Sequence, residues 1–260
     1  MNLGKLYKKN KFVKSIQLGS HDILDKGLPE HIKKLQNSES QSKYSKLSKK
    51  EKYILEVFKV YSNIMDKLDV LENIKLLIRT YPHNKTYRKK ITNNNHIRYH
   101  IEAYYLNLIG VFDRLMHLTN LIHDLGIDDK KVTYQIITTN KHLEKTKLKE
   151  LLNNLFSKLK KQREVRNLIT HYESYEDPEL NNVRLYEEII LMPSKLGMKV
   201  AKSKKHFYNI TKIIFDNYKK EYISNTCKIF DKINKEVFTS INLIFNEIDK
   251  VYRLNNNCSI

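Results

Sequence analysis

The chain has 260 residues, of which 40% are hydrophobic, so it can bury a sizeable core and is not intrinsically disordered. Only 6 glycines and 4 prolines are present, which excludes turn-rich β-sandwiches and barrels and predicts an all-α fold. The formal net charge of +19 predicts a polyanionic partner such as nucleic acid, although a lysine-rich composition typical of AT-rich genomes contributes to it.

Residues 1–47 hold half of the 6 glycines, so we expect an N-terminal arm or cap with one short helix near 29–36. A helical domain is expected over residues 48–260. Ser48 and Glu51 form a capping-box pattern, which predicts a helix from Ser48 to the residue before Pro82. A basic loop follows, and the apolar spacing then predicts a helix from His96 to about Leu125.

Three further helical regions follow after a β-prone stretch at 131–140, which we interpret as a loop. The spacing predicts one long helix over 141–172, a break at Pro178 and a short helix near 180–191. The C-terminal region reads as two helices, 203–219 and 221–253, or as one kinked helix. Its apolar seam could pack within an elongated bundle of about five to seven helices or pair two subunits.

The cysteines Cys227 and Cys258 lie in different parts of the chain, so neither a disulfide framework nor a zinc site is expected. We therefore expect a reducing, cytoplasmic environment. No signal peptide and no long apolar run is visible, so we expect no membrane partner. Phosphate-binding loops and dinucleotide fingerprints are also absent from the sequence, and no cofactor or metal is expected.

One segment, KLKKQREVRNLITHYESY, combines a basic run with the pattern Arg166-Asn167 followed by His171. On a helix, Asn167 and His171 are one turn apart and Arg166 approaches them from the edge of the same polar arc. The apolar stripe through Val165, Leu168, Ile169 and Tyr172 would face the core. The arc is consistent either with a solvated helix face or with a catalytic group.

This pattern resembles the HEPN superfamily, whose members carry an Arg, a following polar residue and a His four to six residues later on a long helix. The resemblance implies a metal-independent endoribonuclease that acts as a homodimer around a shared groove. Arg166 would stabilise the charge of the transition state, Asn167 would orient His171 or hold a phosphate oxygen, and His171 would transfer protons. Basic residues of the same segment would bind the RNA, namely Lys158, Lys161 and Arg163.

This chain departs from the pattern of one subtype of the superfamily. In its toxins that pair with a nucleotidyltransferase antitoxin, a Tyr commonly stands two residues after the His, where this chain has Glu173. A role in phage defence or a stress response therefore fits better, and an antitoxin or other regulatory partner stays open. The alternative function is a non-catalytic HEPN module that binds RNA or protein.

A second histidine pair, His96 and His100, has the i, i+4 spacing of metal ligands. No third ligand is apparent, so we interpret these residues as structural histidines.

Overall fold

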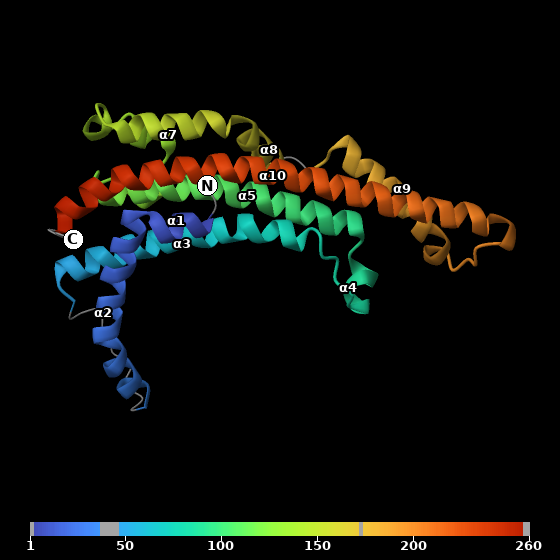
Figure 1. Cartoon of the computed structure of the whole chain (residues 1–260), viewed down its shortest axis with the longest axis horizontal. Helices are drawn as coiled ribbons and strands as arrows, with labels where there is room; N and C mark the ends of the chain where they lie inside the picture. The colour runs from blue at the N-terminus through green and yellow to red at the C-terminus, as the bar shows by residue number, and fades with distance from the viewer. Residues whose placement is uncertain (1–2, 37–46, 172–173, 257–260) are drawn as a thin grey trace. The chain divides into compact units, whose positions relative to one another are not determined.

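The structure is a computed structural model that describes residues 3–36, 47–171 and 174–256. These residues contain no strand, which confirms the all-α prediction, and more helices than the expected five to seven. The α-helices are α1 (Leu3–Lys9), α2 (Lys11–Gln36), α3 (Lys49–Leu77), α4 (Lys85–Lys90), α5 (Asn93–Ile122), α6 (Tyr134–Thr138), α7 (Lys147–Lys158), α8 (Lys160–His171), α9 (Pro178–Lys195) and α10 (Lys205–Asn256) (Figure 1). Short 3-10 helices occur at Asp129–Lys131, Lys141–Leu143 and Lys202–Lys204.

The chain folds into two compact units that do not follow the order of the sequence. Unit 1 contains residues 1–69, 110–159 and 235–260, and unit 2 contains residues 70–109 and 160–234. The three long helices α3, α5 and α10 each contribute one segment to each unit. Unit 1 includes residues on both sides of residue 47. The expected domain boundary at this residue stays a prediction.

The N-terminal helices supply core residues to unit 1. The ring of Phe12 is fully buried and lies 5.2 Å from the ring of Phe245 and 5.4 Å from that of Tyr252, both on α10. Asn10 precedes α2, accepts a hydrogen bond from the amide of Val13, and donates to Asn242 at 2.9 Å. The expectation of one short helix near 29–36 is wrong, because α1 and α2 together cover residues 3–36 except Asn10.

Local signals place the starts and ends of several helices. The Ser48 hydroxyl accepts from the amide of Glu51 at 3.2 Å, and the Glu51 carboxylate accepts from the amide of Ser48 at 2.9 Å, so the predicted capping box is confirmed. After α5, Gly126 has a φ of +66°, a conformation that glycine adopts without strain. The predicted helix end there is confirmed to within a few residues.

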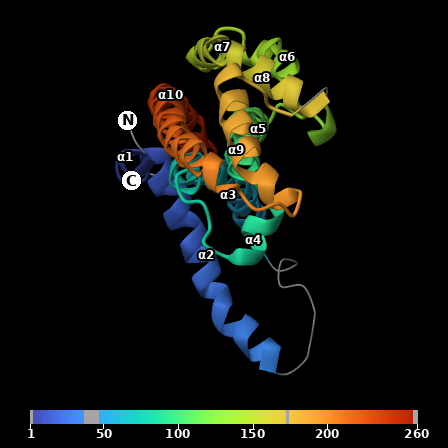
Figure 2. The same cartoon turned by 90° about the vertical axis from the view of Figure 1, so that its right-hand side faces the viewer.

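The β-prone stretch at 131–140 contains the short helix α6, which packs on α7 within unit 1 (Figure 2). Tyr134 of α6 stacks on Phe156 of α7 with ring centroids 3.6 Å apart. The Tyr134 hydroxyl also donates to Asn153 at 2.7 Å. An aromatic stack and a side-chain hydrogen bond thus hold a helix that its β-prone sequence does not favour.

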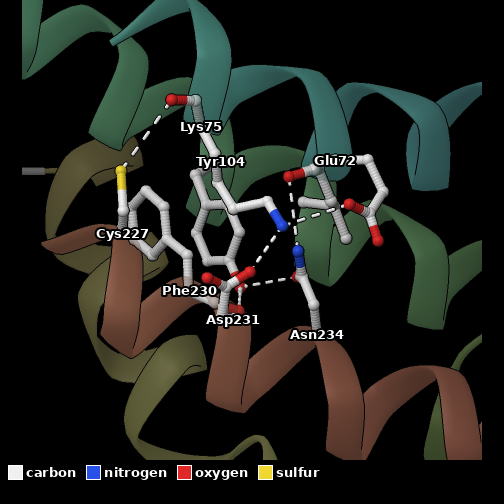
Figure 3. A network of polar contacts seen from close by, with 8 residues as sticks. Glu72, Lys75, Tyr104, Cys227, Phe230, Asp231 and Asn234 are labelled. Carbon is white, nitrogen blue, oxygen red and sulfur yellow. Dashed lines mark hydrogen bonds and ion pairs between the residues drawn. The ribbon is translucent and has the colours of Figure 1, made fainter. Parts of the chain in front are cut away.

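In unit 2, a buried tyrosine connects α5 to α10 (Figure 3). The Tyr104 ring stacks on Phe230 with centroids 3.6 Å apart, and its hydroxyl donates to Asn234 at 2.9 Å. Burial strongly raises the pKa of Tyr104, so the hydroxyl remains a donor. The phenol therefore satisfies its polar atom inside an apolar core, which stabilises this packing.

Beside this stack, Lys75 lies between the carboxylates of Glu72, at 3.1 Å, and Asp231, at 2.5 Å (Figure 3). The thiol of Cys227 is fully buried, and its Sγ lies 3.9 Å from the carbonyl oxygen of Lys75. Burial raises the pKa of Cys227, so this thiol stays protonated and is poorly suited to metal binding or nucleophilic attack.

The C-terminal region forms one continuous helix, α10, rather than two. Along its second half, Val237, Ile241, Ile244 and Ile248 are all buried inside unit 1. This part of the apolar seam therefore packs within the chain, and the alternative of a subunit-pairing seam does not apply to it. Within the described residues, no helix is both long enough and apolar enough to cross a membrane.

Candidate active site

The motif residues lie on α8, a helix of 12 residues that starts after a break at Leu159. The prediction of one helix over 141–172 is wrong at this point, because Leu159 ends α7 with φ −87° and ψ 9°. Neither Gly nor Pro marks the break. The apolar spacing does, since the regular steps to Leu159 are followed by a polar gap before Val165.

No residue of α8 is buried, and its sides differ in exposure. Arg166 is half-buried, whereas Asn167 and His171 are exposed. Around the helix, Arg166 is separated from Asn167 by about 100° and from His171 by about 140°. The expected polar arc is therefore divided, with the imidazole and the amide facing outward and the guanidinium on a half-buried side.

The expected apolar stripe of α8 is also modified. Val165 and Ile169 are half-buried as expected, but Leu168 is 59% exposed and lies between Asn167 and Ile169 in the chain. The exposed Leu168 therefore places apolar surface on α8 beside the predicted catalytic residues.

The three predicted RNA-binding residues are not all on the same helix. Lys161 is exposed and Arg163 half-buried on α8, in unit 2. Lys158 belongs to α7 in unit 1, where its amine donates to the Ser240 hydroxyl at 3.3 Å. Their role in RNA binding stays a prediction.

A polar network anchors the chain shortly after the motif. The amide of Tyr175 donates to the carboxylate of Glu102 on α5 at 2.8 Å. The carboxylate of Asp177 accepts from the hydroxyls of Tyr175, at 2.9 Å, and Tyr222 on α10, at 2.5 Å, and caps α9 through the amide of Leu180. The segment that follows His171 is thus tied to two other helices of unit 2. Tyr172 and Glu173 lie outside the described residues.

Burial and the neighbouring Asp177 carboxylate raise the pKa of both Tyr175 and Tyr222, so both phenols stay protonated and donate. This network was not predicted from the sequence, in which Pro178 indicated only a break. The pattern Asp177-Pro178-Glu179 is a helix-start signal, with a capping carboxylate and a proline in the first turn. This pattern could have predicted the start of α9.

His96 is buried and held by protein contacts, as interpreted from the sequence, and the His100 ring packs against it with ring centroids 4.5 Å apart. Nδ1 of His96 lies 3.0 Å from the Tyr87 hydroxyl, and its Nε2 lies 3.0 Å from the carbonyl oxygen of Leu77. Both ring nitrogens of His96 therefore have protein partners. Among the described residues, no group of three His, Cys, Asp or Glu side chains could hold a metal ion.

This pair predicts a loss of stability in acid. Burial, together with the neighbouring His96, lowers the pKa of His100 from 6.5 to about 4. Between these values the unfolded chain binds a proton that the folded chain does not, so stability falls as the pH drops from about 6.5 towards 4. We expect His100→Gln to reduce this loss by about 1–2 kcal/mol, in urea unfolding at pH 7 and 4.5.

The pKa of His96 is also lowered by burial, so part of the pH dependence should persist in His100→Gln. The same substitution at the exposed His142 is the control and should leave the wild-type profile unchanged. Equal pH profiles for wild type and His100→Gln would contradict the assignment.

Comparison with known proteins identifies the family. The model of the HEPN_Cthe2314-like HEPN family matches residues 5–249, which include α8 and its motif. No curated protein and no solved structure matches the chain. Since the family model covers most of the chain, from α1 to the second half of α10, this protein belongs to the HEPN_Cthe2314-like HEPN family.

Proposed function

We propose that the protein is a metal-independent endoribonuclease in which Arg166, Asn167 and His171 carry out the reaction. The observation that supports it best is the motif itself, placed on α8 of a HEPN-family chain with Asn167 and His171 exposed to solvent. The net charge of +19 favours a phosphate-rich substrate. A role in phage defence or stress response is part of this proposal.

In the proposed reaction, the ribose 2′-oxygen attacks the adjacent phosphorus while the bond to the 5′-oxygen breaks. A base removes the proton from the 2′-hydroxyl, and an acid gives one to the leaving 5′-oxygen. An imidazole can do either. A guanidinium stabilises the charge on the phosphorane oxygens. The products would be a 2′,3′-cyclic phosphate and a 5′-hydroxyl end.

A second copy of the chain would complete this site. One histidine cannot act as base and acid at the same moment, and in one chain His171 projects about 140° around α8 from Arg166. Two motif helices facing each other would supply two imidazoles and two guanidinium groups. The exposed Leu168 beside the motif supplies apolar surface for such a contact.

The direct test is cleavage of a mixed RNA pool by the wild-type protein in the presence of excess chelator. We expect chelator-insensitive cleavage, with product ends that map as 2′,3′-cyclic phosphates. Salt-sensitive RNA binding without cleavage would favour the alternative, a non-catalytic HEPN module.

The proposed dimer predicts that Leu168→Lys weakens self-association. A charge buried at an interface without a partner is strongly unfavourable, so we expect the dimer dissociation constant to rise at least about tenfold, with a parallel loss of cleavage. Analytical ultracentrifugation measures the first effect. Leu76→Lys is the matched control, because Leu76 is 65% exposed and lies on α3 away from the motif helix in sequence. Equal dimerisation of both variants would contradict this interface.

A further inference from the structure

The end of the α9–α10 hairpin in unit 2 is unusually apolar for an exposed segment. From residue 192 to residue 210 no side chain is buried. Five large apolar side chains of this segment and the next turn of α10 are more than half exposed: Met192 54%, Leu196 64%, Met198 63%, Phe207 64% and Ile213 61%. We call residues 192–214 the hairpin surface. Concentrated apolar exposure of this kind typically marks a binding surface.

Part of this surface is an ordered helical face. Phe207, Ile210 and Ile214 follow i, i+3, i+7 spacing, so they occupy one side of the first turns of α10. Thr211 and Phe215 are buried on a different side of the same turns. The helix thus has one side packed inside unit 2 and a second apolar side left exposed.

The same surface is strongly basic. No Asp or Glu occurs from residue 189 to residue 215. All the lysines of this stretch are exposed: Lys195, Lys199, Lys202, Lys204, Lys205 and Lys212. Exposed apolar side chains interleaved with lysines are the composition of a segment that lies in the interface of an anionic bilayer, where apolar groups enter the acyl region and lysines reach the headgroups.

We propose that the hairpin surface attaches the protein to an anionic lipid bilayer. The same face of a second copy would bring a second set of lysines against the first, which is repulsive. RNA phosphates suit the lysines but would leave aliphatic groups such as Leu196, Met198 and Ile213 in water. Residues 196–201 form no helical face that a protein groove could match, whereas fluid acyl chains need no shape complementarity. This proposal departs from the expectation of no membrane partner, which rested on the lack of a spanning segment.

The test uses fluorescence at a single site in the full chain. The chain contains 0 tryptophans, so Phe207→Trp introduces a unique reporter on the exposed side of α10. With vesicles of equal parts phosphatidylglycerol and phosphatidylcholine, we expect a blue shift of its emission, and with pure phosphatidylcholine none. The matched control is Leu18→Trp, because Leu18 is 65% exposed on α2 in unit 1. Its emission should not move.

Two variants separate the apolar and ionic contributions. Ile210→Ser combined with Ile213→Ser keeps the charge, and we expect it to weaken vesicle binding at least about tenfold. Changing Lys202, Lys204 and Lys205 to Gln should weaken binding roughly a hundredfold. The charge-matched control changes Lys85, Lys89 and Lys90, which are all exposed on α4, and should have a much smaller effect. Circular dichroism checks that all variants stay folded.

Three results would overturn the proposal. A blue shift of Phe207→Trp that grows with protein concentration without lipid would assign the surface to a second copy. Cosedimentation with anionic vesicles without a blue shift would mean that net charge alone attracts the protein. A shift produced by an RNA oligonucleotide but not by vesicles would assign the surface to nucleic acid. None of these outcomes depends on whether the protein cleaves RNA.

Discussion

His171→Ala should strongly reduce RNA cleavage while leaving the protein folded. A positioned acid–base group contributes about 10²–10⁴ in rate, and the dimer would lose both copies at once, so we expect a loss of about 10³-fold or more. The fold should tolerate the change because His171 is exposed at the last turn of α8 and no residue of that helix is buried. Single-turnover cleavage of a labelled RNA, with thermal unfolding of the same samples, measures both quantities.

The control for this variant is His142→Ala, an equally conservative loss of an exposed imidazole outside the motif. It should cleave RNA at the wild-type rate. Cleavage by His171→Ala at near the wild-type rate would remove His171 from the mechanism, and a contaminating nuclease would be recognised because its activity is the same in every variant.

Glu187→Ala should cause a large loss of stability in unit 2. Glu187 is 5% exposed on α9, and its carboxylate accepts from the amide of Asn93 at 2.6 Å, from the Asn93 side chain at 2.7 Å and from the amide of Asn94 at 2.8 Å. It therefore satisfies the donors at the start of α5. Removing the carboxylate leaves one buried donor and two part-buried donors unpaired, so we expect a loss of about 3 kcal/mol in urea unfolding.

The neighbouring Glu188 gives a matched control. Its carboxylate lies 2.6 Å from the amine of Lys195, but both side chains are about half exposed, at 46% and 52%. An exposed ion pair contributes little, so Glu188→Ala should change the free energy of unfolding by less than about 1 kcal/mol. Similar losses for the two variants would show that the capping of α5 by Glu187 is not what stabilises this region.

Two predictions about helix bounds failed for different reasons. Gly19, Gly27 and Pro29 suggested an irregular N-terminal region, yet α2 runs through all of them. The first half of this helix is held by Phe12 and its buried neighbours, which pack on α10, and such packing overrides weak intrinsic helix propensity. The break at Leu159 carries no glycine or proline, and only the polar gap between Leu159 and Val165 marks it in the sequence.

The amino-acid sequence by itself determined the all-α class, the Ser48–Glu51 cap, the ends of α5 and the motif on a helix, because each depends on composition, helical spacing or contacts within a few residues. Tertiary structure alone decided that Asn167 and His171 are exposed while Arg166 is half-buried, since exposure depends on what packs around α8. Tertiary structure also decided how the chain is anchored after His171. The Tyr175 amide binds Glu102, and Asp177 binds the Tyr222 hydroxyl. Glu102 and Tyr222 are remote in the sequence, so these contacts form only once the helices have packed.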